Sequence, residues 1–505
     1  MTPREVKLAF AGVLAAMTLA AIDGTAVAPA LPQVVRELHG FDRLSWVVTA
    51  YLLTSTVSIP VYGKLSDLFG RRRLFAWAIV IFVVGSVLCA ASQTMVQLVA
   101  ARGIQGLGAG GLIPLAIATI GDLFAPRDRG KIQGYTSSLF AITSIVGPLL
   151  GGVLTDHASW RWIFLVNVPV GAAALVVVLR FMRIPRQPRE THIDVAGTVT
   201  MVVSSTCVLL ALVWGGNQYP WGSAEVIGLL AAGAAAAGLF VAAERRAAEP
   251  IIPLRLFRER TFTVAVSAGP IAGASMYVIT VYMPIYVQQV IGGSATGSGA
   301  VLIPYLLSWI VSSTIFGKRV SRTGRYKAYP IFGGVVTTVA FVLLSQLGPH
   351  AAYWQVAVTL CVGGIGMGPL FQLYTVAAQN AVPPGDIGAS TAALSFMRSI
   401  GGALALAGFA AVITSRLASE LAVRVPDGSV TAKSLLDTSK AIAPAAADGA
   451  KAALSASLDH VYLWCVPVAA LLVVTGLLLP ELPLRTVAAH QQVREDASDP
   501  ATEAG

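Results

Sequence analysis

Long apolar runs separated by short polar connections occupy most of this 505-residue chain. A helix needs about 20 mostly apolar residues to cross the hydrocarbon core of a bilayer. Only helices or a closed barrel satisfy the backbone there, and these runs are too long to be barrel strands. The pattern therefore predicts about fourteen membrane-spanning helices, at residues 8–31, 45–63, 74–93, 97–124, 131–155, 161–182, 193–214, 224–243, 262–289, 297–317, 328–346, 353–380, 387–415 and 460–482.

Basic residues concentrate in some connections between the runs, and they predict the orientation of the chain. Lysine and arginine favour cytoplasmic loops, so the connections that carry them should lie inside. With an even number of spans, both termini are predicted to be cytoplasmic. The basic connections fall at 64–73, 127–131, 183–189, 245–260 and 318–327, whereas the connections near 215–223, 290–296 and 347–352 carry neither lysine nor arginine.

Composition supports a membrane protein and argues against two other classes. Charged residues make up 12% of the chain, against about 25% in soluble domains. The net charge is +10, but the basic residues lie in separate short loops, so no nucleic-acid partner is expected. The four cysteines lie in apolar runs without disulfide or metal-ligand spacing, and the six histidines are scattered. A membrane-embedded enzyme or receptor is therefore only a remote alternative.

One polar connection repeats in the two halves of the chain. Residues 63–73 read GKLSDLFGRRR and residues 317–327 read GKRVSRTGRYK, each between apolar runs. Duplicated halves are a common layout of secondary transporters. The spacing of the two copies suits eight spans better than six, so the runs at 193–214 and 224–243 should be two added central helices.

The repeat also divides the chain into predicted domains. We expect a six-helix half over 1–182, two inserted central helices with linkers over 183–260, and a second six-helix half over 261–482. Within the last domain, the polar, Ala/Ser-rich segment 416–458 should form a partly ordered outer loop. The tail 483–505 should be a disordered cytoplasmic segment.

Small residues and one arginine mark two of the runs. Arg102 lies in LVAARGIQGLGAGG, and a charge inside a span is costly unless it faces protein or water. Gly106, Gly108 and Gly111 fit the pattern G-x-G-x-x-G, but no strand precedes them, so close helix packing is favoured over dinucleotide binding. In the next run, residues 147–152 read GPLLGG, which interrupts the helical hydrogen bonds and supplies a small-residue face.

These segments together resemble the major facilitator superfamily, and more narrowly its fourteen-span drug:proton antiporter family. The loop at 63–73 is similar to that superfamily's inner-loop signature, and the stretch around Arg102 is similar to its fourth-helix motif. Residues 22–32 resemble the family's first-helix motif, and 282–288 and 398–402 also look familial. The resemblance implies two six-helix halves plus two extra central helices. The fifth-helix motif associated with antiport is matched by Gly147, Pro148, Gly151 and Gly152.

Asp23 is the expected proton-coupling residue, with Arg102 as its partner. Asp23 is the only carboxylate deep inside a clean apolar run, where burial favours the neutral form of a carboxyl group and protonation can switch with access to either side. In the resembled family this position is linked to proton coupling. Two alternatives stay open: Asp23 near the outer mouth and bonded to Thr25, and Arg102 snorkelling from an outer helix end.

A second polar group is predicted to be an inner-gate latch. The carboxylates of Asp67 and Asp122 should lie near the inner face, pair with arginines there, and release them as the halves rock. The alternative is a solvated surface ion pair worth under about 1 kcal/mol. Ser321 replaces Asp67 in the second copy of the loop, so the latch carboxylate is expected in one half only. The predicted latch comprises Gly63, Asp67, Gly70, Arg71, Arg72 and Asp122.

Aromatic and polar side chains are the candidates for a substrate cavity between the halves. Aromatic faces suit hydrophobic or cationic ligands. Ordinary helix packing is an equal alternative for each of them. The candidates are Trp46, Tyr51, Tyr277, Tyr282, Tyr286, Gln288, Gln372 and Arg398.

The expected function is proton-coupled export of amphipathic drugs, antibiotics or toxic compounds across the bacterial plasma membrane. An exporter of an endogenous metabolite, lipid or siderophore is the alternative within transport. The chain has no G-x-x-x-x-G-K-[ST] motif for ATP, so no cofactor is expected and the proton gradient should drive transport. The expected partners are a small amphipathic substrate, protons and the lipid bilayer, and a monomer is expected for a two-half fold.

Overall fold

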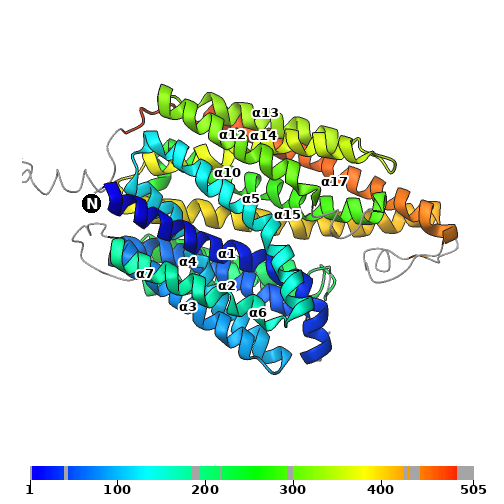
Figure 1. Ribbon diagram of the computed structural model, residues 1–505. Helices are drawn as coiled ribbons and strands as arrows, with labels where there is room; N and C mark the ends of the chain where they lie inside the picture. The colour runs from blue at the N-terminus through cyan, green and yellow to red at the C-terminus, as the bar shows by residue number, and fades with distance from the viewer. Residues whose placement is uncertain are drawn as a thin grey trace, which may run out of the picture. The chain divides into compact units, whose positions relative to one another are not determined.

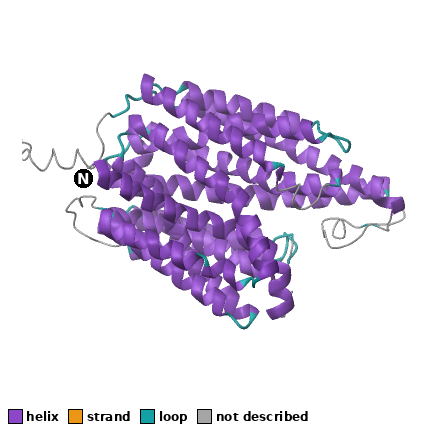
Figure 2. Cartoon of the chain, in the orientation of Figure 1, coloured by secondary structure: helices purple, strands orange, loops and turns teal. Residues whose placement is uncertain are grey.

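A computed structural model gives the fold of the chain, and it describes residues 3–38, 44–182, 194–216, 218–292, 300–425, 430 and 444–485. These residues are predominantly helical (Figure 2). Within the described ranges, the β-type pairing is limited to an isolated bridge between Gly215 and Tyr219. The all-helical fold predicted from the apolar runs is therefore confirmed.

The helices follow one another in the order of the predicted runs (Figure 1). Each predicted range overlaps a helix, and the run at 161–182 is divided between α6 and α7. The α-helices are α1 (Pro3–Leu38), α2 (Leu44–Phe69), α3 (Arg71–Ala91), α4 (Met95–Leu123), α5 (Pro126–His157), α6 (Arg161–Leu165), α7 (Asn167–Phe181), α8 (Val195–Trp214), α9 (Ala224–Glu244), α10 (Arg260–Tyr286), α12 (Leu302–Thr323), α13 (Ala328–Leu344), α14 (Tyr353–Asn380), α15 (Ile387–Arg424) and α17 (Pro444–Leu478). Shorter elements are the 3-10 helices η2 (Leu254–Arg258) and η4 (Pro384–Asp386) and the π-helical turn η3 (Val287–Ile291).

Ten helical segments of the described chain are long and apolar enough to cross a membrane. They include residues Arg4–Val27 of α1 and the whole of α3, α4, α8 and α9, and α13 is a shorter apolar helix. The helices α2, α5 and α12 are not among these segments; each contains several Ser or Thr residues, and α5 and α12 also carry several charged residues. The chain is thus a multi-pass membrane protein, whereas a total of fourteen spans stays a prediction.

The segment 416–458 differs from the predicted loop. Helix α15 continues to Arg424 and α17 begins at Pro444, so both flanks of the segment are helical, and residues 426–429 and 431–443 lie outside the described residues. Alanine-rich sequence has a high helix propensity, which the emphasis on its polar residues overlooked.

The start of the predicted disordered tail is held against α14. The Asn380 side chain donates to the Pro483 carbonyl at 3.2 Å and accepts from the Arg485 amide at 3.1 Å. Residues 486–505 lie outside the described residues. Residues 483–485, which the prediction placed in the disordered tail, are therefore part of the described structure.

The contacts of the chain define two compact units. Unit 1 comprises Met1–Thr263, Thr375–Phe396 and Leu482–Gly505, and unit 2 comprises Val264–Tyr374 and Met397–Glu481. Unit 1 thus includes the end of α14 and the start of α15, although both belong to the second half of the sequence. The predicted domain boundaries at 182, 260 and 482 follow the duplication of the sequence and stay a prediction.

Helix α4 lies at the centre of unit 1, where it packs on α2 and α3 (Figure 1). Glycines permit this close approach. A Cβ added at Gly106 would lie 2.5 Å from the Tyr51 carbonyl oxygen of α2, and one at Gly108 would lie 2.4 Å from the Phe82 nitrogen of α3. The prediction that these glycines serve helix packing is confirmed.

The two predicted central helices are α8 and α9, and they attach to unit 1 through α2. They pack on each other, and Ser204 of α8 donates to the Gly233 carbonyl of α9 at 2.9 Å. The ring of Trp214 at the end of α8 meets that of Trp46 on α2, with centroids 5.9 Å apart. Helix α8 is therefore in direct contact with α2, the helix that contains residues 63–69 of the predicted loop.

Candidate functional site

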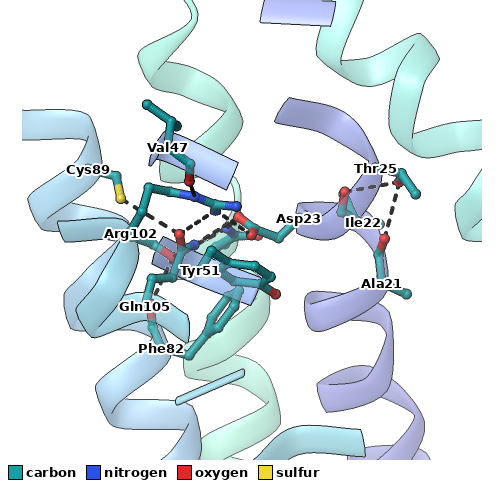
Figure 3. A network of polar contacts seen from close by, with 12 residues as sticks. Ala21, Ile22, Asp23, Thr25, Val47, Tyr51, Phe82, Cys89, Arg102 and Gln105 are labelled. Carbon is teal, nitrogen blue, oxygen red and sulfur yellow. Dashed lines mark hydrogen bonds and ion pairs between the residues drawn. The ribbon is translucent and has the colours of Figure 1, made fainter. Parts of the chain in front are cut away.

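Asp23 of α1 is fully buried and lies at the centre of a polar cluster inside unit 1 (Figure 3). Its Oδ2 atom accepts from Arg102 Nη1 at 2.8 Å. Its Oδ1 atom accepts from Gln105 Nε2 at 2.8 Å and from Asn167 Nδ2 at 3.0 Å. The structure thus brings together the two residues that the sequence predicted as a pair, and it adds two neutral donors.

The Arg102 side chain is buried in the bundle and does not reach outward from the helix end. It is 2% exposed, and its Nε donates to the Val47 carbonyl of α2 at 3.2 Å. The guanidinium lies over the Tyr51 ring, 4.0 Å from the centroid, a cation–π contact that strengthens when water is absent. Helix α2 therefore fixes the arginine while α1 supplies its counter-charge.

Sequence reasoning did not identify the neutral members of this cluster. Ser86 of α3 accepts from Gln105 Nε2 at 2.8 Å and from Asn167 Nδ2 at 3.3 Å, and it donates to the Phe82 carbonyl at 2.9 Å. One signal was available, because Gln105 lies three residues after Arg102 and thus on the same helix face. Asn167 and Ser86 are single polar residues in apolar runs and carry no comparable signal.

Thr25 does not bond the Asp23 carboxylate, contrary to the alternative considered from the sequence. Its hydroxyl contacts the carbonyls of Ala21 and Ile22, each at 3.1 Å, as Figure 3 shows. It also lies 3.4 Å from the Thr143 carbonyl of α5. Thr25 therefore joins α1 to α5 two residues away from Asp23.

Glycines of α5 set the distance between that helix and the Asp23 region of α1. A Cβ added at Gly147 would lie 2.0 Å from Thr25 Oγ1, and one at Gly151 would lie 2.2 Å from the Ala26 carbonyl oxygen. A Cβ at Gly152 would meet nothing within 4 Å. Only two of the predicted motif glycines thus pack on α1, and the Pro148 side chain lies outside the described residues.

The neighbouring glycines provide a matched pair of substitutions. We expect Gly151→Ala to lower efflux by about tenfold, because a shift of α1 displaces Asp23 and small misplacements are costly. Gly152→Ala should leave efflux close to wild type. Initial efflux rates from cells with equal amounts of each variant provide the measurement, and equal losses in both would contradict this role of the α1–α5 contact.

The buried ion pair between Asp23 and Arg102 makes the site sensitive to the charge on Asp23. Removing one partner of a buried ion pair leaves an uncompensated charge and costs about 3–5 kcal/mol. Protonation of Asp23 removes such a partner without a mutation, so it changes the balance of forces on Arg102 strongly. Gln105 and Asn167 can still donate to the carboxyl oxygens, so the pocket accommodates either protonation state.

The predicted latch forms a second buried cluster in unit 1, at the junction of α2 and α15. Asp67 accepts from the Gly388 amide at 3.1 Å and from the Ala389 amide at 2.8 Å, so its carboxylate covers the N-terminus of α15, where negative charge is favoured. Arg71 lies 2.6 Å from Asp67 and 2.7 Å from Asp122. All three charged side chains are largely buried, which argues against the solvated surface pair.

Burial and pairing act in opposite directions on Asp67. Burial raises its pKa to about 6, while the Arg71 charge and the Ala389 amide lower it. The carboxylate is therefore ionised at neutral pH, and the neighbouring donors offset the cost of its burial.

The glycines of the loop fit tightly, whereas Arg72 lies apart from the latch. A Cβ at Gly63 would lie 2.3 Å from Ala392 Cβ of α15, and Gly70 has φ +90°, a conformation that favours glycine. Arg72 is exposed and donates to the Leu179 carbonyl of α7. Successive residues of a helix point about 100° apart, so Arg71 and Arg72 cannot share one partner set, and the structure removes Arg72 from the predicted latch.

Arg129 is a further buried charge near this junction, and sequence reasoning assigned it no role. Its Nη1 donates to Gln379 Oε1 of α14 at 3.0 Å, and Gln379 Nε2 donates to Thr391 of α15 at 2.9 Å. Its Nε donates to the Phe124 carbonyl at 2.9 Å. Burial lowers the pKa of Arg129 to about 9, so it stays charged at neutral pH.

The predicted substrate residues of unit 1 have partners in helix packing. Trp46 meets Trp214 of α8, and Tyr51 lies under Arg102 with its side chain 8% exposed. Tyr51 therefore belongs to the Asp23 cluster in the structure.

The predicted substrate residues of unit 2 are also engaged within their own unit. The Tyr282 hydroxyl donates to the Leu406 carbonyl at 3.0 Å, and the Tyr286 hydroxyl donates to the Gly348 carbonyl at 2.5 Å. Tyr277 packs on α15, where a Cβ at Gly402 would meet its ring, and Gln288 lies in the π-helical turn.

The last two candidates, Gln372 and Arg398, are both placed by α14: Gln372 belongs to this helix, and Arg398 contacts its residue Phe371. Gln372 is 1% exposed and accepts from the Ser313 hydroxyl at 2.6 Å. Arg398 donates to the Phe371 carbonyl at 2.6 Å and lies 4.3 Å from the centre of the Phe371 ring. Contact with substrate stays a prediction for all eight candidates.

Comparison with known proteins identifies relatives over most of the chain. Residues 13–406 match the family described as the Major Facilitator Superfamily. An uncharacterized MFS-type transporter of Mycobacterium tuberculosis is 37% identical over 99% of this chain and 72% of its own length. Multidrug resistance protein 3 of Bacillus subtilis is 36% identical over 83% of this chain and 81% of its own length. The fold is similar to that of the human organic anion transporter MFSD10, with a TM-score of 0.62 and 14% identity over 93% of this chain and 100% of that one.

Proposed function

The chain belongs to the Major Facilitator Superfamily, and we propose that it exports amphipathic drugs, antibiotics or other toxic compounds in exchange for protons. The relative named as a multidrug resistance protein supports export of such compounds. Its bacterial source, and that of the mycobacterial relative, supports a location in the bacterial plasma membrane. Transport of small molecules across a membrane is the activity of the family, so a transporter is favoured over an enzyme.

The proposal includes a topology. Two six-helix halves and the inserted pair α8 and α9 give fourteen spans, with both termini in the cytoplasm. The order of the helices and the basic connections support this arrangement. The protein acts as a monomer, and the proton gradient drives it without a cofactor.

The observation that carries the coupling proposal is the buried contact between Asp23 and Arg102. A carboxylate and a guanidinium inside apolar helices are expensive to maintain, and such residues commonly mark proton pathways. Three side chains and the Val47 carbonyl bond or cover this pair, and they come from α2, α4 and α7. A change at Asp23 therefore affects several helices.

The coupling step follows from these contacts. With Asp23 ionised, Arg102 is held between the carboxylate and the Val47 carbonyl. A proton on an Asp23 carboxyl oxygen cancels the charge that holds Arg102, so α1 and α4 can separate or re-pack. Substrate binding from the cytoplasm favours the deprotonated state, so the proton is released to the cytoplasm, and uptake of a proton from the outside completes the cycle. A ligand shifts such an equilibrium only by its different affinity for the two states.

The available energy is sufficient for export. One proton moving through 100 mV provides about 2.3 kcal/mol, which supports roughly a fifty-fold concentration difference of an uncharged substrate exchanged one for one. The cluster described above contains one carboxylate, that of Asp23. One proton per transport cycle is therefore the simplest stoichiometry.

A resistance assay tests the proposed substrate class. A drug-sensitive bacterial host that produces the protein should tolerate higher concentrations of lipophilic cationic and amphipathic toxins. A fluorescent compound of this kind should be kept out of the cells, and a proton uncoupler should cause it to accumulate inside them. Full sensitivity to every compound, with the protein present in the membrane, would favour an endogenous cargo such as a lipid, siderophore or other metabolite.

A further inference from the structure

The segment that follows the inserted helices is folded against unit 1. Residues 244–258, here called the linker, connect α9 to α10 and include η2. Glu244 is 3% exposed and accepts from the amides of Ile251 and Ile252 at 3.0 and 3.3 Å. Ile251, Ile252 and Leu256 are buried. The linker therefore turns back on the end of α9 and has a small packed core of its own.

One end of the linker holds the loop at the end of α2. Glu249 Oε2 lies 2.5 Å from Lys64 Nζ, and the Lys64 side chain is only 4% exposed. A buried ammonium group is costly without a partner. Lys64 directly follows Gly63, which packs on α15, so Glu249 holds the residue next to the inner gate.

The other end of the linker holds the start of α15. Arg255 Nη2 lies 2.8 Å from Asp386 Oδ2, and Asp386 is 1% exposed. Asp386 is the last residue of η4, and the amides of Gly388 and Ala389 that follow it donate to Asp67. The linker thus has one ion pair on each side of the junction that the Asp67 carboxylate closes.

The second copy of the polar loop shows that a buried lysine is not a general property of this loop. Lys318 follows Gly317 as Lys64 follows Gly63, but the structure leaves Lys318 exposed. Within the linker, Arg246 and Arg255 are both exposed, and Arg255 also forms an ion pair with the buried Asp386. Burial of Lys64 therefore goes together with its ion pair to the linker.

We propose that the linker is a clamp on the inner gate, in which Glu249 and Arg255 are positioning residues that hold Lys64 and Asp386 in the latched arrangement. This inference rests on the proposed transport function and on the Asp67 latch described above, and it adds a role for the inserted helices. Because α8 and α9 are attached to α2 and continue into the linker, their packing sets how readily the junction of α2 and α15 opens. Loss of either ion pair makes opening more frequent.

A single reporter cysteine measures this opening without any substrate or gradient. Ser390 of α15 is fully buried beside the latch, and Ser390→Cys is nearly isosteric. In a chain whose four native cysteines are replaced by alanine, we expect an impermeant maleimide to label Cys at this position slowly in inside-out vesicles. Glu249→Gln or Arg255→Gln should each speed labelling by about fivefold, the effect of one partly buried ion pair.

Matched controls separate positioning from general destabilisation. Arg246→Gln and Lys318→Gln should leave the labelling rate unchanged, and the exchange Lys64→Glu with Glu249→Lys should restore slow labelling that Glu249→Lys alone has lost. Thermal unfolding of each variant in detergent identifies variants that simply fail to fold. Equal labelling in the linker variants and in the Arg246 and Lys318 controls would overturn the clamp.

One further variant distinguishes failure of the clamp from failure of the latch. Asp67→Asn should speed labelling at least as much as the linker variants. If it does and the linker variants do not, the clamp alone is overturned. If Asp67→Asn also has no effect, the latch is overturned and the clamp with it.

Discussion

Replacement of Asp23 by asparagine is expected to abolish gradient-driven efflux, with a loss of at least about 100-fold in initial rate. Asparagine keeps an oxygen that can accept from Gln105 and Asn167, but it cannot take up and release the coupling proton. It also leaves Arg102 without its counter-charge in a buried site. Efflux of a fluorescent substrate from energised cells, normalised to the amount of protein in the membrane, measures the loss.

Two comparisons show whether this loss concerns coupling. Asp23→Glu retains a titratable carboxyl group and should retain part of the efflux, because only one methylene is added. Substrate exchange at equal proton concentration on both sides should survive in Asp23→Asn better than energised efflux does. Complete loss of exchange in Asp23→Asn, together with complete loss of efflux in Asp23→Glu, would indicate a folding defect. Efflux at the wild-type rate in Asp23→Asn would refute the assigned role.

Replacement of Asp67 by asparagine should have the second largest effect, a decrease of about tenfold in efflux. The amide loses the charge that pairs with Arg71, and its NH₂ group cannot accept from the Ala389 amide. The inner gate then closes poorly, so the transport cycle slows. Efflux rates and the labelling of the Ser390→Cys reporter should change together.

The second copy of the loop supplies the control for this substitution. Ser321 occupies the position that corresponds to Asp67. Because the latch carboxylate is present in one copy only, Ser321→Ala should change efflux by less than about twofold. Equal decreases in both variants would count against the latch.

Helix positions and the central ion pair were predictable from the sequence for simple physical reasons. An apolar run of about 20 residues has no other stable form in a bilayer. Asp23 and Arg102 are charges within such runs, and a buried charge needs a partner. The structure joins them at 2.8 Å.

The partners that the sequence did not indicate are neutral or belong to the backbone. Asn167 and Ser86 are uncharged, so nothing in the apolar pattern demands a partner for them. The amides of Gly388 and Ala389 bond Asp67, and a helix N-terminus 321 residues away has no side-chain signature. The ion pair between Lys64 and Glu249 depends on how the linker folds, which charge pattern alone does not specify.

The most direct test of proton coupling at Asp23 is the proton movement that substrate addition causes in proteoliposomes without an imposed gradient. A pH-sensitive dye inside the vesicles reports the movement. Wild-type protein should give a substrate-dependent change in internal pH that an uncoupler collapses, and Asp23→Asn should give none. Substrate-driven proton movement of normal size in Asp23→Asn vesicles would contradict the account.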